Sequence, residues 1–150
     1  MNNVLIDSCF WFSYLGTRND NNQVIAKVIY ERLEKNSCNL IIPYPSLYET
    51  VNTKLLRDKN RKAADWFLKQ LVSNPRYYKI YDDSYRESAF AKTLEGRNRG
   101  ISLVDQILRE MMKDKFLRID TLITFNTGDF IDVCSKYGVD LINEKTQFNE

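Results

Sequence analysis

The sequence has 150 residues, of which 43% are hydrophobic and 28% charged, and this size and composition indicate one folded domain over residues 1–150. The net charge of +2 permits nucleic-acid binding without indicating it, and the absence of histidine excludes every mechanism that needs an imidazole as acid, base or metal ligand. No apolar run approaches the roughly 18–20 residues of a membrane span and the N-terminus lacks a signal-peptide pattern, so we expect a cytoplasmic protein without a membrane segment.

The first half of the chain alternates short apolar runs with segments of helical periodicity. We expect Ser8 to cap the first helix and Gly16 to end it. Pro43 should end the second strand, and Pro45 suits the first position of the helix that follows. In chain order, this half predicts a strand at residues 4–6, a helix at 8–14, a loop at 17–23, a helix at 22–35, a strand at 40–42, a helix beginning near Pro45 and a helix at 59–74.

The second half continues the same alternation. An apolar stripe of Val104, Leu108 and Met111 indicates a helix, and Gly138 suits the end of the last one. Strands that alternate with helices indicate a parallel α/β sheet with helices on both faces. In chain order, this half predicts a strand at residues 77–81, a helix capped by Asp83 or Ser84 that runs to Glu95, a helix at 102–115, a strand at 121–125, a helix at 130–137 and a strand at 139–142.

Four acidic residues are predicted at one edge of this sheet. Asp7 directly follows the first strand, and Glu49 lies in the first or second turn of the helix after the second strand. Asp105 lies in the first turn of its helix, and Asp129 follows the fourth strand within a short loop. Because ligand sites in parallel α/β folds lie beyond the carboxyl ends of the strands, we expect the four carboxylates to converge there.

A metal ion would explain such a cluster. Two carboxylates about 4 Å apart repel by roughly 4 kcal/mol at an effective dielectric constant near 20, so converging acids need a cation among them. Hard divalent cations prefer oxygen ligands, and a bound cation lowers the pKa of water and neutralises charge on a phosphate oxygen. The three cysteines are widely spaced, which argues against a zinc site or a disulfide framework.

Each acid also has a structural explanation. Asp7 could cap the next helix, and Glu49 could interact with a helix dipole. Asp105 could be the capping partner of Ser102, and Asp129 could be a turn residue. Only the common location of the four acids favours a site.

Five stretches of the sequence resemble the PIN-domain family, and most closely its small VapC-type toxins. The likeness covers nearly the whole chain, with the motifs in the family's order and spacing. The stretches are Val4-Leu5-Ile6-Asp7-Ser8, Ile42-Pro43-Tyr44-Pro45-Ser46-Leu47-Tyr48-Glu49, Ser102-Leu103-Val104-Asp105, Ile123-Thr124-Phe125-Asn126-Thr127-Gly128-Asp129-Phe130 and Gly138-Val139-Asp140-Leu141-Ile142-Asn143.

The resemblance implies a PIN-like three-layer α/β/α sandwich, a Mg²⁺ or Mn²⁺ site and cleavage of single-stranded RNA. It also implies a homodimer and an antitoxin partner, which is common but not universal in the family. Ser8 and Thr124 match positions that support the acids. The fourth metal-site position is open between Asn126 and Asp129. The family's three core acids match Asp7, Glu49 and Asp105.

The candidate RNA-binding residues each have two explanations, RNA contact or an ordinary structural role. Arg97 and Arg99 precede the Asp105 helix and are candidates to hold a phosphate, although a surface loop explains them equally well. Tyr77, Tyr78, Tyr81 and Tyr85 could stack bases, yet strand tyrosines more often pack in the core, as we also expect of Trp11.

The sequence is compatible with three functions to different degrees. The leading prediction is a metal-dependent endoribonuclease, the toxin of a toxin–antitoxin pair. The alternative is a catalytically weak PIN-like module that binds RNA or protein. A phosphoacceptor receiver domain fits poorly, because Asp7 has no acidic neighbour and no matching lysine follows the last strand.

Overall fold

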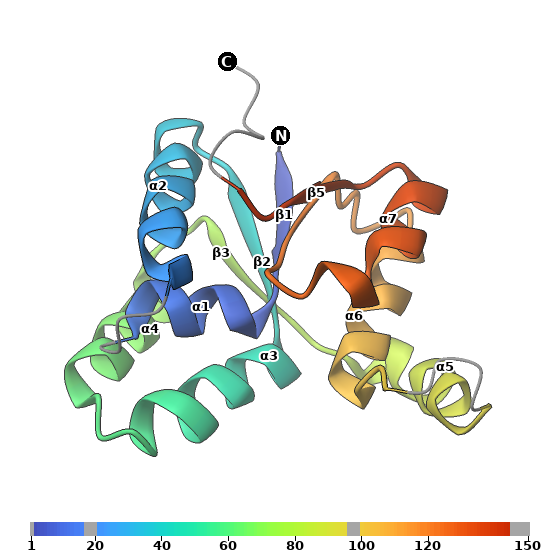
Figure 1. Ribbon diagram of the computed structural model, residues 1–150, viewed down its shortest axis with the longest axis horizontal. Coiled ribbons are helices and arrows are strands. Elements are labelled where there is room, and N and C mark those ends of the chain that lie inside the picture. Colours follow the sequence, from blue (N-terminus) through green and yellow to red (C-terminus); the bar gives the residue numbers. More distant parts are fainter. Residues whose placement is uncertain (1, 17–20, 96–99, 145–150) are drawn as a thin grey trace.

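A computed structural model describes residues 2–16, 21–95 and 100–144, and in them five strands form one sheet (Figure 1). The strand order is β3-β2-β1-β4-β5, and every neighbouring pair is parallel. This confirms the predicted parallel α/β architecture. The strands are β1 (Asn3–Ile6), β2 (Asn39–Pro43), β3 (Tyr77–Ile80), β4 (Thr121–Ile123) and β5 (Asp140–Ile142).

Helices cover both faces of the sheet, which gives the predicted three-layer α/β/α sandwich. In Figure 1, α1, α2 and α4 lie on one side of the strands, and α6 and α7 on the other, with α5 packed on α6. No helix in the described residues is long and apolar enough to cross a membrane. The helices are α1 (Ser8–Leu15), α2 (Asn21–Lys35), α3 (Tyr44–Tyr48), α4 (Arg61–Ser73), α5 (Asp83–Leu94), α6 (Leu103–Lys113) and α7 (Ile131–Tyr137), with a π-helix η1 (Glu49–Leu56) and a 3₁₀ turn η2 (Thr127–Asp129).

The alternation of side chains along β1 explains why both faces are covered. Val4 and Ile6 point into the core under α1, α2 and α4, whereas Leu5 packs with Leu108 and Met112 of α6 on the opposite face. Val4, Leu5 and Ile6 are all fully buried. A strand that is apolar on both faces is typical of a central parallel strand, because it must be covered on each side.

Several predicted element ends shift by one to three residues. The fourth strand ends at Ile123 instead of residue 125, although the Thr124 N–H still donates to the Ile142 carbonyl at 3.3 Å. Of the predicted loop at residues 17–23, residues 17–20 lie outside the described residues, and the rest belongs to α2 because that helix begins at Asn21. Gly138 ends α7 in the left-handed conformation (φ 67°), as predicted.

Two predicted helix caps are wrong. Helix α1 begins at Ser8 itself, so the capping position falls on Asp7, which makes no side-chain capping bond. Helix α5 begins at Asp83, and the preceding Asp82 makes none either, because its carboxylate is bonded to Arg86. The cap of α6 is as predicted: Ser102 Oγ accepts the Asp105 N–H at 3.1 Å.

Candidate functional site

The four predicted acids come from separate elements and meet at the carboxyl edge of the sheet. Asp7 joins β1 to α1, and Glu49 stands where α3 passes into η1. Asp105 lies in the first turn of α6, and Asp129 ends η2. Figure 1 shows α1, α3 and the start of α6 at the same end of the strands.

Electrostatic coupling shows that the four carboxylates are neighbours. The pKa of Asp105 is raised to about 7, chiefly by burial and then by the negative charge of Asp7, with further contributions from Asp129 and Glu49. A raised carboxyl pKa means that the charged form is disfavoured by its surroundings. The groups around Asp105 therefore disfavour its negative charge.

Asp7 is the most enclosed of the four, with 4% of its surface exposed. Thr124 Oγ1 donates to Asp7 Oδ2 at 2.8 Å, and Cys9 Sγ donates to the same oxygen at 3.2 Å. Burial and the charge of Asp7 raise the pKa of Cys9 to about 12, so this thiol keeps its proton and remains a donor. The Asp7 carboxylate is thus held by neutral groups that leave its charge uncompensated.

Ser8 connects Asp7 with Glu49. Its Oγ donates to Glu49 Oε2 at 2.6 Å and lies 3.4 Å from Asp7 Oδ1. A hydroxyl has one proton, so the shorter contact takes it and the Glu49 carboxylate is fixed beside Asp7. The hydroxyl that the sequence suggested as a helix cap is therefore a link between two acids.

Thr124 ties Asp7 to the segment that carries Asp129. Its Oγ1 accepts the Asn126 N–H at 2.9 Å, which directs its own proton to Asp7. Asn126 Nδ2 donates to Asp129 Oδ2 at 2.6 Å. Asn126 and Asp129, the two candidates for the fourth metal-site position, are therefore bonded to each other through their side chains.

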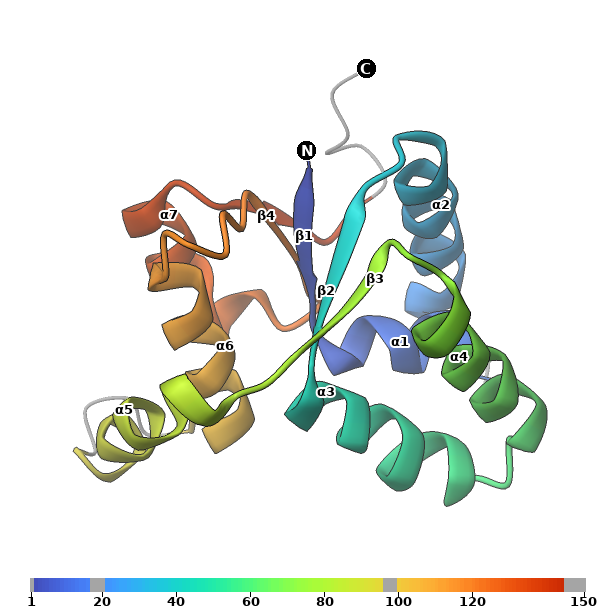
Figure 2. The ribbon, with the colours of Figure 1, turned by 180° about the vertical axis from the view of Figure 1, so that it is seen from behind.

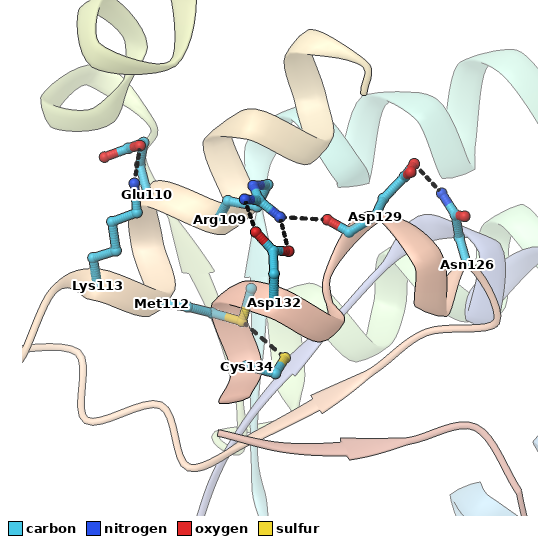
Figure 3. Close-up of polar contacts among 8 residues, drawn as sticks. All are labelled: Arg109, Glu110, Met112, Lys113, Asn126, Asp129, Asp132 and Cys134. Carbon is cyan, nitrogen blue, oxygen red and sulfur yellow. Dashed lines mark hydrogen bonds and ion pairs between the residues drawn. The ribbon is translucent and has the colours of Figure 1, made fainter. Parts of the chain in front are cut away.

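Arg109 of α6 bonds to the same segment, a contact that no sequence motif indicated. Figure 3 shows its guanidinium forming two bonds with Asp132, at 2.6 and 2.7 Å, and one with the Asp129 carbonyl at 2.6 Å. The Arg109 guanidinium lowers the pKa of Asp132 to about 2, so the pair stays charged at neutral pH. Arg109 thus neutralises Asp132, outside the acidic cluster, and holds Asp129 by its main chain.

The residues present suit a hard divalent cation, although they are not arranged as a finished ligand set. Within the described ranges, no group of three or more acidic or thiol side chains has ligating geometry. Among the side chains that the structure describes, no Lys or Arg forms an ion pair with any of the four carboxylates. Uncompensated carboxylates gather at a buried edge only at a cost, which a proton or a cation relieves.

The predicted RNA contacts Arg97 and Arg99 lie outside the described residues. Separately, a pocket of about 500 Å³ opens between α1, α2 and α4 and is lined by Tyr14, Tyr30 and Trp66, among others. None of the four acids borders it, so it is not part of the carboxylate site.

Comparisons with known proteins support the fold. No family model and no curated protein matches the sequence. The crystal structure of Mycobacterium tuberculosis VapC20, described as a sarcin–ricin loop cleaving toxin, superposes with a TM-score of 0.68 over 86% of this chain and 94% of that chain. The two sequences are 19% identical. The structural similarity to this VapC toxin therefore confirms the PIN-like fold that the sequence motifs predicted.

Replacing Arg109 with Met is expected to lower the free energy of unfolding by about 1–3 kcal/mol, because the Asp129 carbonyl loses its donor along with the ion pair. The matched change Asp132→Asn should cost less than about 1 kcal/mol, because Asp132 is 63% exposed and Arg109 keeps its bond to Asp129. Urea denaturation followed by circular dichroism measures both. Equal losses in the two variants would contradict a distinct contribution from the Asp129 bond.

Proposed function

We propose that this chain is a divalent-metal-dependent endoribonuclease that hydrolyses RNA phosphodiester bonds. The observation that carries the proposal is the gathering of four carboxylates whose hydrogen-bond donors, among the side chains that the structure describes, are neutral, with the pKa of Asp105 raised to about 7. Similarity in fold to a toxin described as cleaving the sarcin–ricin loop supports RNA as the substrate.

Asp7 and Asp105 would hold the principal ion, Mg²⁺ or Mn²⁺, because the Asp7 charge is the largest electrostatic influence on Asp105. Glu49 would assist through a second ion or a water, and Asp129 with Asn126 would orient the attacking water. When bound, the ion neutralises charge on a phosphate oxygen and lowers the pKa of water.

The chain's own residues set the geometry of attack. Ser8 and Thr124 orient the Glu49 and Asp7 carboxylates by donating their hydroxyl protons to them. The water oxygen would bond to phosphorus as the bond to the 3′ oxygen breaks. The leaving oxygen takes a proton, and the products are a 5′-phosphate and a 3′-hydroxyl.

The test is cleavage of a panel of structured RNAs, including a sarcin–ricin stem-loop, by the purified protein in Mg²⁺, in Mn²⁺ and in EDTA. We expect cutting that requires a metal ion and is absent in an Asp7→Asn protein. Cutting that persists in EDTA or in the Asp7→Asn protein would overturn the proposal.

A second candidate is a PIN-like module that binds RNA or protein with weak or no catalysis. It is favoured by one observation, the lack of a ready ligand set among the described acids. RNA binding of equal strength with and without metal, and no cutting in either condition, would support this candidate.

We also propose, from the resemblance and the shared fold, that the protein is a toxin controlled by an antitoxin and forms a homodimer. None of the three cysteines forms a disulfide in the structure, which fits the reducing cytosol as the compartment of action. Sedimentation of the purified chain tests the dimer without depending on activity.

A further inference from the structure

Three tyrosines lie together at the carboxyl ends of β2 and β3, outside the acidic cluster. The rings of Tyr44 and Tyr81 are stacked, with centroids 4.8 Å apart and an interplanar angle of 22°. Tyr44 also meets Tyr48, with centroids 5.9 Å apart. We call Tyr44, Tyr48 and Tyr81 the tyrosine platform.

The platform is exposed although it is apolar. Tyr81 is 70% exposed and Tyr48 is 56% exposed. Tyr30 and Tyr77 are also joined through their hydroxyls, at 2.7 Å, but both are buried, whereas Tyr81, which is hydrogen-bonded to Tyr44, is exposed. Tyr44 stacks on one face of the Tyr81 ring, and most of the Tyr81 surface remains exposed to solvent.

The platform adjoins the carboxylate site through the chain itself. Tyr44 is the first residue after β2, and Tyr48 immediately precedes Glu49. Tyr81 is the first residue after β3, and Figure 2 shows the chain leaving β3 past the start of α3 on its way to α5. Glu49 is bonded to Ser8, next to Asp7. An RNA strand bound across the acids would therefore pass close to Tyr48 and its neighbours in the platform.

We propose that the tyrosine platform stacks an unpaired base of the RNA strand whose phosphate lies at the carboxylates. Every base has a π face, so aromatic platforms bind single strands with little dependence on sequence. A base within a duplex has both faces covered by its neighbours, so the platform would select loops and unpaired segments next to the cut. This inference rests on the proposed ribonuclease function.

The test uses the RNA that the protein cuts, with an abasic nucleotide placed in turn at each position flanking the cut. Stacking on one aromatic ring changes affinity about tenfold or more, so Tyr81→Ala should raise KM by about tenfold with little change in kcat. Tyr81→Phe keeps the ring and should behave as wild type. The matched control is Tyr78→Ala, an exposed tyrosine on β3 that is outside the platform.

The abasic RNA separates stacking from a structural effect. At one flanking position it should raise KM for the wild type by about the same factor as Tyr81→Ala, and should add nothing in the Tyr81→Ala protein. A 2-aminopurine at that position should lose fluorescence on binding to the wild type and keep it with the variant. Additive losses, or unchanged KM for both changes, would overturn the proposal, as would an equal effect of Tyr78→Ala.

The platform can also be tested if the ribonuclease proposal fails. If the wild type cuts no RNA with any metal, the same oligonucleotides are used in fluorescence anisotropy binding measurements. Binding that weakens with both Tyr81→Ala and base removal would still support the platform. No binding, or binding indifferent to both changes, would overturn it.

Discussion

An Asp105→Asn protein is expected to lose RNA cleavage by about 10³-fold while its metal-free form becomes more stable near pH 8. The loss follows because metal-assisted charge stabilisation contributes several kcal/mol, and each 1.36 kcal/mol is a factor of ten in rate. The gain follows because Asn removes a charge that lies near Asp7, Asp129 and Glu49. A residue that merely supports the fold would give the opposite change in stability.

The stability difference should depend on pH in a defined direction. The pKa of Asp105 rises from an ordinary value near 3.8 in the unfolded chain to about 7 in the folded protein. Between these values the folded state keeps a proton that the unfolded state has released, so the free energy of unfolding falls as pH rises. The advantage of Asp105→Asn should therefore be small at pH 4, grow through pH 7 and then level off.

Urea denaturation at pH 4, 6, 7 and 8 measures this difference, in EDTA in one series and in Mn²⁺ without EDTA in another. The ion should stabilise the wild type at pH 8 and have a smaller effect on the variant, because a ligand stabilises only the state that binds it. Glu87→Gln, an exposed acid on α5, controls for the change in net charge. If Asp105→Asn is less stable than the wild type at pH 8 in EDTA, the electrostatic account of the site fails.

Topology made the neighbourhood of the acids predictable from the sequence. Asp7 directly follows an apolar run, Glu49 and Asp105 start helices, and Asp129 follows another apolar run. Parallel strands bring such positions to one edge, so the approximate location required no side-chain detail. Whether these residues bind metal remains a prediction.

The contacts that fix the acids could not be predicted, because they join residues far apart in sequence. Arg109 meets Asp132 across 23 positions, and Ser8 meets Glu49 across 41. Local patterns favoured a helix cap for Ser8, and only the packing of η1 against α1 brings Glu49 to its hydroxyl. Helix ends were imprecise for the same reason: capping depends on partners as well as on residue type.

Core residues were more predictable, and Trp11 gives the largest expected effect on stability. Trp11 is fully buried, as expected from the sequence, and its ring meets that of Phe67 at 4.8 Å and that of Phe10 at 5.3 Å. It lies one helical turn beyond Asp7 on α1, so its packing holds the helix that begins at the site. Trp11→Ala is expected to lower the free energy of unfolding by about 3–5 kcal/mol, because the cavity cannot collapse among so many rings.

A graded series separates packing from general loss of an aromatic ring. Trp11→Phe should cost only about 1–2 kcal/mol, since it keeps a ring and removes an indole N–H that has no hydrogen-bond partner among the described residues. Phe116→Ala should change the free energy of unfolding by less than about 0.5 kcal/mol, because Phe116 is 95% exposed. Urea denaturation measures all three. A Trp11→Ala protein as stable as Phe116→Ala would show that the aromatic core does not hold α1, and that the position of Asp7 depends on its hydrogen bonds alone.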